Sequence, residues 1–435
     1  EYALLEYSNY DKLYGTGEHQ KYLNLFKGFG WGDDGFSNAP TTNWYDEIFR
    51  KAIVQNYQLS MSGGGDKTKV YFSAGYNQTE GIIKHTGFDR ISGRLNVSHK
   101  VKDWVTFSTN TSFSSTKHIQ ATTTAAANPS RTAMLLLPGV GPRDENGEYY
   151  ADLPYGYYLY NIPQMLELNE YTGKTYNLTT SNALTFNLAP GLTFKSSYNF
   201  DFTWMFEHHY SDPRTRLGRR DNGVIMASAM DIVNFQSEQV LNYNKTFNKI
   251  HRVNAVAGFS YTNYQYHIQS GESNGVANPD LRLLSSGAIP VSADESYSEW
   301  KLAGFFTRLS YTLKDKYIFS GTVRYDGSSR FGRENLWGTF PSLSFAWRIN
   351  EESFMEGMEW ISDLRLRASY GVTGNSSIGN YVSHRLYTGN VSYDSKPGIV
   401  QSTIGNRQLT WEKKHSKNLG LSLGLFQDRI TASFD

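Results

Sequence analysis

One stretch of the chain constrains its fold more than any other, because it alternates strictly between large apolar residues and small or charged ones. From Leu343 the sequence reads Leu-Ser-Phe-Ala-Trp-Arg-Ile, which puts Leu343, Phe345 and Trp347 on one side and Arg348 on the other. A period of two residues is the pattern of a β-strand with two unlike faces. The same alternation occurs in about a dozen segments, many of which end in Tyr, Trp or Phe, so the pattern predicts an all-β protein.

The alternation has the form expected of a sheet that separates lipid from water. In a transmembrane β-barrel the apolar positions face lipid, the polar positions face the lumen, and aromatic residues gather at both interfaces. We therefore expect one set of side chains to point out of the curve of the sheet: Leu343, Phe345, Trp347, Leu364, Leu366 and Tyr370. The polar set is expected to point inward: Arg348, Arg365, Arg367 and Asp201.

Composition supports a membrane barrel. Aromatic residues make up 15% of the 435 residues and tyrosine alone accounts for 31, yet the mean hydropathy is −0.52. A barrel with a wet interior and long loops combines these properties, whereas a large soluble protein seldom does. No run approaches about 18 consecutive apolar residues, so a transmembrane helix is not expected.

Charge and cysteine content exclude several other classes of protein. There are 42 Lys and Arg against 41 Asp and Glu, a net charge of +1, so no global field attracts nucleic acid and no nucleic-acid partner is expected. The absence of cysteine excludes disulfides, zinc-thiolate sites and a thiol nucleophile. It also suits a chain that crosses an oxidising periplasm unfolded.

The strand candidates form an antiparallel meander of about 14 strands. They are expected near 55–62, 68–77, 88–99, 104–115, 175–188, 191–206, 232–247, 251–268, 298–313, 316–326, 339–349, 363–373, 408–426 and from 429 onward. Helices are expected to be few, chiefly before Tyr14 and within 116–174.

The connections between these strands fall into two populations that alternate along the chain. Short turns follow odd-numbered strands, at 63–67, 101–103, 189–191 and 314–316 among others. Long connections follow even-numbered strands, at 116–174, 207–231, 269–297, 327–338 and 374–407. A membrane meander produces this parity, because short turns lie on the periplasmic side and long loops outside. Residues 1–52 are then an external loop region that precedes the second barrel strand, and the open sheet belongs to 53–435.

An antiparallel sandwich or propeller also alternates. A propeller needs a repeat of roughly 40 to 50 residues, and no such self-similarity is visible. Several strand candidates exceed about 14 residues, whereas globular strands usually have five or six. Strand length and loop parity therefore favour the membrane barrel.

The sequence contains no catalytic constellation, so no enzyme, cofactor or metal site is expected. Gly271-Glu-Ser273-Asn-Gly275 has the spacing of a nucleophile elbow but lacks the helix that must follow it. His208 and His209 are adjacent on a strand and so point to opposite faces. The acidic stretch 144–148 is interpreted as a turn rather than a calcium loop, because its glycine comes too early.

Ligand-binding residues are more plausible in this sequence than catalytic residues, and the candidates lie in the long connections. Six tyrosines in the 116–174 loop offer flat rings with polar tips that suit sugars or peptides: Tyr149, Tyr150, Tyr155, Tyr157, Tyr158 and Tyr160. The alternative is that they hold the loop together or contact a lid protein. Asp326, Arg330 and Arg333 near the outer rim are either ligand contacts or solvated loop charges.

Five blocks of sequence are more specific than the alternation. They are Asn43–Arg50, Gln55–Gly64, Tyr71–Tyr76 with Glu80–Lys84, Arg324–Gly332 with Trp337–Ser342, and Leu366–Asn375. In this order they resemble the barrel of SusC/RagA-type TonB-dependent outer-membrane transporters.

That resemblance implies a barrel of 22 strands, about 14 of which lie in this chain, so that the sheet is open because it is truncated. The plug domain, the TonB-contacting segment and the C-terminal strands are expected to be absent. It further implies a nutrient importer in the outer membrane of a Gram-negative bacterium, surrounded by lipid and taking up oligosaccharides or peptides. The implied partners are the TonB complex and a SusD-like surface lipoprotein. An adhesin or secretion barrel without active import is the alternative.

Overall fold

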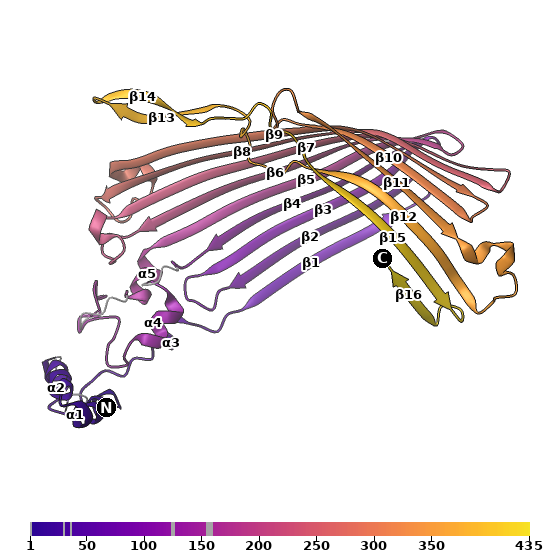
Figure 1. Ribbon diagram of the computed structural model, residues 1–435. Coiled ribbons are helices and arrows are strands. Elements are labelled where there is room, and N and C mark those ends of the chain that lie inside the picture. The colour runs from indigo at the N-terminus through magenta and orange to yellow at the C-terminus, as the bar shows by residue number, and fades with distance from the viewer. Residues whose placement is uncertain (1, 29–30, 35–36, 123–126, 154–159) are drawn as a thin grey trace.

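The computed structural model describes residues 2–28, 31–34, 37–122, 127–153 and 160–435, and they form one broad curved sheet with small helices at one end (Figure 1). The helices are α1 Tyr2–Tyr14, α2 Glu18–Gly28, α3 Trp44–Ile48, α4 Pro129–Leu135, α5 Ile162–Leu168, and the 3₁₀ turns η1 Arg219–Asp221, η2 Leu284–Ser286, η3 Ile349–Glu351 and η4 Ser353–Met355. The strands are β1 Val54–Gly64, β2 Thr68–Glu80, β3 Gly87–Lys102, β4 Val105–Ile119, β5 Glu170–Ala189, β6 Leu192–Ser211, β7 Val224–Phe247, β8 His251–Val276, β9 Gly287–Leu313, β10 Tyr317–Ser328, β11 Trp337–Arg348, β12 Ile361–Asn375, β13 Leu386–Tyr393, β14 Lys396–Thr403, β15 Glu412–Leu425 and β16 Ile430–Phe434.

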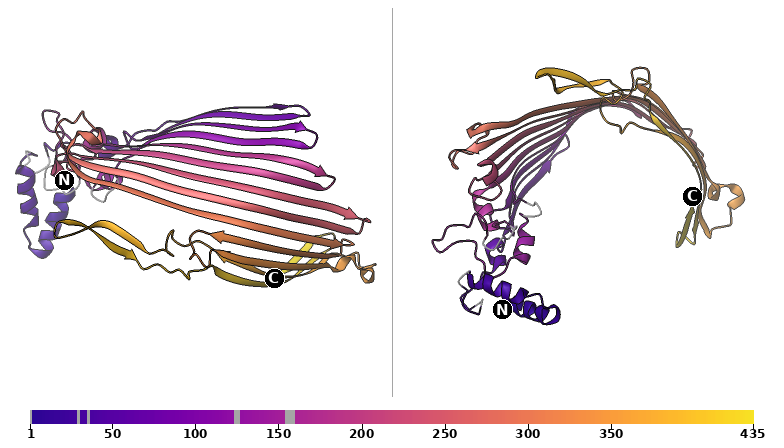
Figure 2. Two further views of the ribbon diagram at one scale, coloured as in Figure 1. Left: turned by 90° about the horizontal axis from the view of Figure 1, so that it is seen from above. Right: turned by 60° about the vertical axis from the view of Figure 1, so that its left-hand side comes forward.

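Within the described residues the main sheet has 14 strands, and they follow one another in chain order from β1 to β12, then β15 and β16. Every neighbouring pair is antiparallel. The edge strands β1 and β16 are not paired with each other, and the sheet curves as an open arc (Figure 2). The predicted all-β meander is therefore confirmed.

The strand register separates the side chains into an apolar face and a polar face. Leu343 pairs with Tyr370, and Trp347 pairs with Leu366, so these four share one face of the sheet. Arg348 pairs with Arg365 on the other face. Following the pairs strand by strand puts Arg367 and Asp201 on that same polar face. The predicted partition into two sets is confirmed.

The apolar face is exposed over most of the sheet. Its exposed large side chains include Tyr57, Leu59, Met61, Phe72, Tyr76, Ile91, Leu95, Phe113, Leu184, Tyr198, Trp204, Leu241, Phe305, Leu309, Phe319, Val323, Leu343, Tyr370, Leu419 and Leu421. Soluble monomers rarely expose a contiguous apolar patch larger than a few hundred Å². A largely apolar face of this extent requires an apolar solvent, which is the lipid of a membrane.

The connections alternate between the two ends of the sheet, as a meander requires. The short turns lie at the right-hand end in Figure 1, whereas the long connections and α3 to α5 lie at the left-hand end. Residues just before β1 belong to the left-hand end, because Arg50 N donates to Ile82 O (2.8 Å) and Phe49 forms a bridge with Ile83. The predicted parity is confirmed for most connections; the exception is the longer connection between β11 and β12, which contains η3 and η4 and lies at the right-hand end. By the same reasoning we expect the left-hand end to be the external one.

Three predictions about the external connections need correction. Much of 207–231 and 269–297 is strand. β6 to β9 extend into these ranges and are far longer than a strand needs to be to cross a bilayer. Within 374–407, β13 and β14 form a separate hairpin whose turn residues Asp394 and Ser395 both have positive φ. Residues 1–52 contain the unpredicted helix α2. A strand segment outside the lipid does not need an apolar face. The alternation of apolar and polar residues therefore weakens in these segments, although the hydrogen bonds between strands continue.

The described part of the chain contains no helix long and apolar enough to cross a membrane.

The N-terminal segment and the loop between β4 and β5 share a buried core. Trp44 and Ile48 of α3 are 2% and 0% exposed, and they pack with Ala133, Ile162 and other residues of that loop. The indole Nε1 of Trp44 donates to Leu137 O at 3.1 Å. The N-terminal segment is therefore anchored on the loop rather than left in solvent.

The assignment of faces predicts the effect of placing an arginine on each side of β11. Leu343 is 66% exposed on the apolar face, so Leu343→Arg in the full-length protein should cost about 2–4 kcal/mol of unfolding free energy in lipid vesicles. Its neighbour Ser344 lies on the polar face, so Ser344→Arg should change that free energy little. Denaturant titration of both variants measures this, and equal losses would contradict the assignment.

Candidate functional site

The described tyrosines of the β4–β5 loop are engaged within the loop. The Tyr149 hydroxyl donates to Glu167 Oε2 at 2.5 Å, and the Arg143 guanidinium lies 3.6 Å from the centre of its ring. Burial, with the hydrogen bond to Glu167 and its negative charge, raises the pKa of Tyr149 to about 12. The hydroxyl therefore stays protonated and keeps donating to Glu167 at neutral pH.

Tyr150 and Tyr160 also contact the loop itself. The backbone N–H of Tyr150 donates to Pro142 O, and its carbonyl accepts from Asn161 Nδ2 at 2.9 Å. Tyr160 packs against the buried core, with Arg216 5.1 Å from the centre of its ring. These contacts are compatible with residues that hold the loop together, and ligand contact by Tyr150 and Tyr160 stays a prediction.

Tyr155, Tyr157 and Tyr158 lie outside the described residues. Their predicted contact with a ligand or lid protein stays a prediction.

Asp326 and Arg330 both have partners near the outer rim. Both carboxylate oxygens of Asp326 accept from Arg324, at 3.1 and 2.9 Å. Arg330 donates to Asn380 Oδ1 at 2.7 Å and to Ser376 O at 3.1 Å, and its guanidinium lies 4.8 Å from the centre of the Trp300 ring. Arg330 therefore links the β10–β11 loop to the segment after β12.

Arg333 is exposed and lines a different hollow, together with Arg385 and Arg407. The structure does not bring it together with the tyrosines.

The motifs judged to be non-catalytic have ordinary structural roles. Gly271, Ser273 and Gly275 lie in β8, where the Ser273 hydroxyl donates to Leu284 O at 2.6 Å. The carboxylate of Asp144 accepts from the backbone N–H groups of Asn146 and Glu148, as in a turn. Within the described residues, no group of three or more His, Asp or Glu side chains could hold a metal ion.

A hollow on the polar face, at the end of the sheet that carries the long connections, is a candidate binding site. Its volume is about 580 Å³, and its lining includes Tyr171 of β5, His209 of β6, Met226 of β7 and Glu272 of β8. The register makes these residues, with Ser292 of β9, one continuous cross-strand row. We call this site the row hollow.

The next row of the ladder completes the floor of the row hollow. It contains Glu207, Ser228 and Ser270 on β6, β7 and β8. Glu207 and Glu272 have no ion pair with another described residue, so both carboxylates are available to accept hydrogen bonds. The floor thus offers carboxylates, hydroxyls and an aromatic ring in fixed positions.

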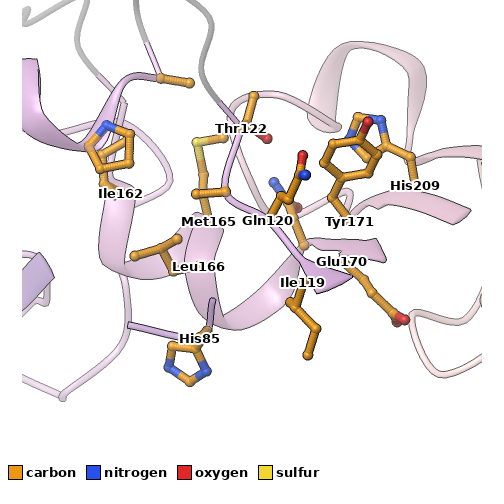
Figure 3. A pocket seen from close by; sticks show the side chains of 14 residues that line it. His85, Ile119, Gln120, Thr122, Ile162, Met165, Leu166, Glu170, Tyr171 and His209 are labelled. Carbon is orange, nitrogen blue, oxygen red and sulfur yellow. The ribbon is translucent and has the colours of Figure 1, made fainter. Parts of the chain in front are cut away.

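One wall of the row hollow is formed by the segment after β4 and leads to a smaller pocket against α5. Figure 3 shows that pocket, in which Gln120, Thr122, Tyr171 and His209 lie on one side and Met165 and Leu166 on the other. The ring centres of Tyr171 and His209 are 5.2 Å apart. The Nε2 of His209 is buried and has no hydrogen-bond partner among the described residues.

A buried carboxylate fixes the β6–β7 connection beside this site. The Asp212 side chain is 0% exposed, and it accepts from Arg214 N, Nε and Nη2 at 2.9, 2.8 and 2.8 Å. Its backbone N–H donates to Asn169 Oδ1 at 2.8 Å, next to α5. Burial alone would raise the pKa of Asp212, but the hydrogen bonds from Arg214 outweigh burial and lower it.

The sequence did not predict the row hollow, because its residues come from strands whose register is not visible in the sequence. The available signal was weak: Tyr171, His209 and Glu272 each sit at a polar-face position of a strand that runs past the membrane.

Comparison with known proteins identifies close relatives over nearly the whole chain. The family model described as TonB dependent receptor-like, beta-barrel matches residues 122–435. TonB-dependent receptor P39 of Formosa agariphila is 32% identical over 398 residues, which cover 90% of this chain and 37% of that protein. TonB-dependent receptor SusC of Bacteroides thetaiotaomicron is 28% identical over 463 residues, covering 98% of this chain and 44% of that protein.

A solved structure agrees with these relatives. The structure of the RagAB peptide transporter superposes with a TM-score of 0.77 at 26% identity, covering 94% of this chain and 47% of that one. The chain therefore spans less than half the length of each of these proteins.

The Asp212 contacts predict a pH-dependent loop. Because its folded pKa is lowered, the ionised carboxylate stabilises the β6–β7 connection at neutral pH, and this stability is lost as pH falls below about 4. Asp212→Asn should remove about 1–3 kcal/mol of local stability and its acid dependence. Hydrogen exchange of residues 211–223, corrected for intrinsic rates, measures both.

The control for this prediction is Asp221→Asn, which changes an exposed carboxylate in the same connection. This variant should retain the wild-type protection. If Asp212→Asn exchanged like wild type at every pH, Asp212 would not be the anchor.

Proposed function

The chain belongs to the TonB-dependent receptor β-barrel family, whose members are outer-membrane transporters of Gram-negative bacteria and not enzymes, and on this premise we propose that the protein imports oligosaccharides or peptides. The chain spans 37% to 47% of its relatives' lengths, so the activity is proposed for the full-length protein. In this proposal residues 53–435 are part of the barrel wall and residues 1–52 are an external region before the second barrel strand.

The row hollow is the observation that carries the proposal. It opens on the polar face, which is the lumen face of a barrel, and it lies at the external end, where a substrate arrives. Glu207, Glu272 and the serine hydroxyls accept or donate hydrogen bonds, and the ring of Tyr171 offers a flat apolar surface. Sugars combine hydroxyl groups with apolar ring faces, so within the proposed substrates this set favours oligosaccharides.

Energised uptake and a lipoprotein lid complete the proposal. TonB-dependent import requires a plug inside the barrel and contact with the TonB complex. SusC and the RagA component of RagAB are relatives over most of this chain, which supports a SusD-like lipoprotein as the partner. The tall external extension of β6 to β9 and the β13–β14 hairpin provide surface for it.

Uptake by cells that lack the native gene tests the function. Cells complemented with the full-length protein should take up a labelled oligosaccharide in a TonB-dependent manner, and a labelled peptide of equal mass should enter more slowly. TonB-independent entry of both probes would contradict active import. Faster peptide entry would reverse the preference between the two substrate classes.

The row hollow predicts a specific loss of affinity. Tyr171→Ala removes the aromatic surface and its contact with His209, so oligosaccharide affinity should fall about tenfold, corresponding to about 1–1.5 kcal/mol. Thr172→Ala, the adjacent position on the opposite face, is the matched control. Titration calorimetry on the purified full-length protein measures both affinities. An unchanged affinity in Tyr171→Ala would remove the row hollow from the binding site.

The tyrosine-rich stretch 149–160 is predicted to contribute to ligand capture or to docking of the lipoprotein lid, and not to barrel assembly. Deleting residues 149–160 in the full-length protein should weaken ligand capture or lipoprotein co-purification, whereas the barrel should still assemble because its strand ladder is intact. Heat-modifiable migration on gels is the control for assembly. Unchanged uptake together with unchanged co-purification would refute a recognition role for this stretch.

A further inference from the structure

Three external segments enclose a second hollow of about 820 Å³ away from the row hollow. They are the loop between β10 and β11, the residues just before β13, and the residues after β14. Each segment contributes one exposed arginine to the lining: Arg333, Arg385 and Arg407 respectively. We call this site the arginine hollow.

The three arginines lack the carboxylate partners that several other arginines of the chain have. Arg143, Arg214 and Arg324 each form an ion pair with a carboxylate. Within the described part of the chain, no hydrogen bond or ion pair engages the side chains of Arg333, Arg385 and Arg407. All three residues are exposed and line the same hollow.

The backbone that carries the arginines is held by long-range contacts. Gly332 N donates to Leu409 O at 3.1 Å, and Asn335 Nδ2 donates to Gln408 O at 3.1 Å. The Ser383 hydroxyl donates to Phe331 O at 3.2 Å. These bonds join all three segments, although they are far apart in the sequence.

A small buried core supports the same segments. Phe331 is 1% exposed and packs with Phe340, Val372 and Trp411. A Cβ on Gly332 would lie 1.7 Å from the carbonyl oxygen of Arg407, so the two segments touch through their backbones. The arginines therefore project from a preorganised frame, which reduces the entropy that a ligand must remove to bind them.

The charge in the arginine hollow is unbalanced. Three guanidinium groups face one carboxylate, that of Glu334, which leaves two uncompensated positive charges when His384 is neutral. Guanidinium groups bind carboxylate, sulfate and phosphate through paired N–H donors. A bound oxyanion would relieve the mutual repulsion of the arginines and use their free donors.

We propose that the arginine hollow binds an oxyanion, a carboxylate, sulfate or phosphate group, carried by an acidic oligosaccharide. This inference rests on the proposed import function and narrows its substrate class. The other lining residues are Gly332, Ser383, Ile404 and Gly405, so Ile404 is the one large apolar side chain among the described lining residues. A peptide in extended form needs pockets for alternate side chains, so this polar lining favours a hydroxyl-rich ligand.

The charge of the row hollow is opposite to that of the arginine hollow. The row hollow's carboxylates Glu207 and Glu272 repel an oxyanion and accept hydrogen bonds from hydroxyl groups. The anionic group of an acidic oligosaccharide would therefore bind in the arginine hollow rather than in the row hollow.

Binding to the purified full-length protein tests the arginine hollow independently of transport. The probes are an oligogalacturonate, a neutral oligogalactan of equal length, inorganic sulfate and an acidic peptide. The variants are Arg333→Gln, Arg385→Gln and Arg407→Gln, and the matched control is Arg220→Gln, an exposed arginine in the β6–β7 connection. Titration calorimetry is run at low and high salt.

The oligogalacturonate should bind at least about tenfold more weakly to each of the three variants, because a hydrogen bond to a charged group is lost. The Arg220→Gln affinity should match wild type, and added salt should weaken the wild-type interaction. Wild-type affinity in all three variants, or tighter and arginine-dependent binding of the acidic peptide, would overturn the proposal. Arginine-dependent binding of sulfate alone would also overturn it, because the ligand would then be a free ion.

Uptake of the same probes separates this inference from the proposed function. If the three variants lose oligogalacturonate binding but wild-type cells do not import it, the arginine hollow stands and the import function fails. If wild-type cells import the neutral oligogalactan and no variant changes the binding of any anionic probe, import stands and the arginine hollow fails.

Discussion

The rest of the structure depends on the antiparallel hydrogen-bond ladder that joins β1 to β12, β15 and β16. In lipid no water is present to pair with backbone N–H and C=O groups, so a spanning strand must find its partners in neighbouring strands. The ladder also fixes the direction of every side chain, because alternate residues point to opposite faces. One set of bonds thus satisfies the backbone and builds the apolar face that lipid covers.

The same hydrogen-bond ladder continues beyond the membrane, where it positions polar side chains. β8 and β9 have 26 and 27 residues, whereas a tilted strand needs about 9–11 to cross the bilayer. The external halves of these strands carry Glu272, Ser270 and Ser292 on the polar face. A rigid sheet therefore holds polar side chains in rows above the membrane, and a binding floor built on strands is positioned more firmly than one built on loops.

The connections are anchored by aromatic cores and buried polar groups. Trp44 and Ile48 tie the N-terminal segment to the β4–β5 loop, and Phe331 and Trp411 tie the segments of the arginine hollow together. Asp212 fixes the β6–β7 connection through Arg214. The connections and strand ends thus present two hollows of opposite charge on fixed supports.

The sequence by itself determined the fold class, the parity of the connections and the faces of residues such as Leu343 and Arg365, because these follow from local alternation within a strand. It also predicted the helix at Tyr2–Tyr14 and the opposite directions of His208 and His209. Lipid imposes this alternation. Where β7 to β9 leave the membrane the alternation fades, so the sequence predicts loops for their external halves.

Only the tertiary structure decided which residues of different strands share a row. Tyr171, His209, Met226 and Glu272 meet because of their register, and a slip of one residue would turn a whole strand to the other face. Arg333, Arg385 and Arg407 likewise meet through long-range backbone contacts. Such pairings are set by interactions between distant parts of the chain, so no local pattern contains them.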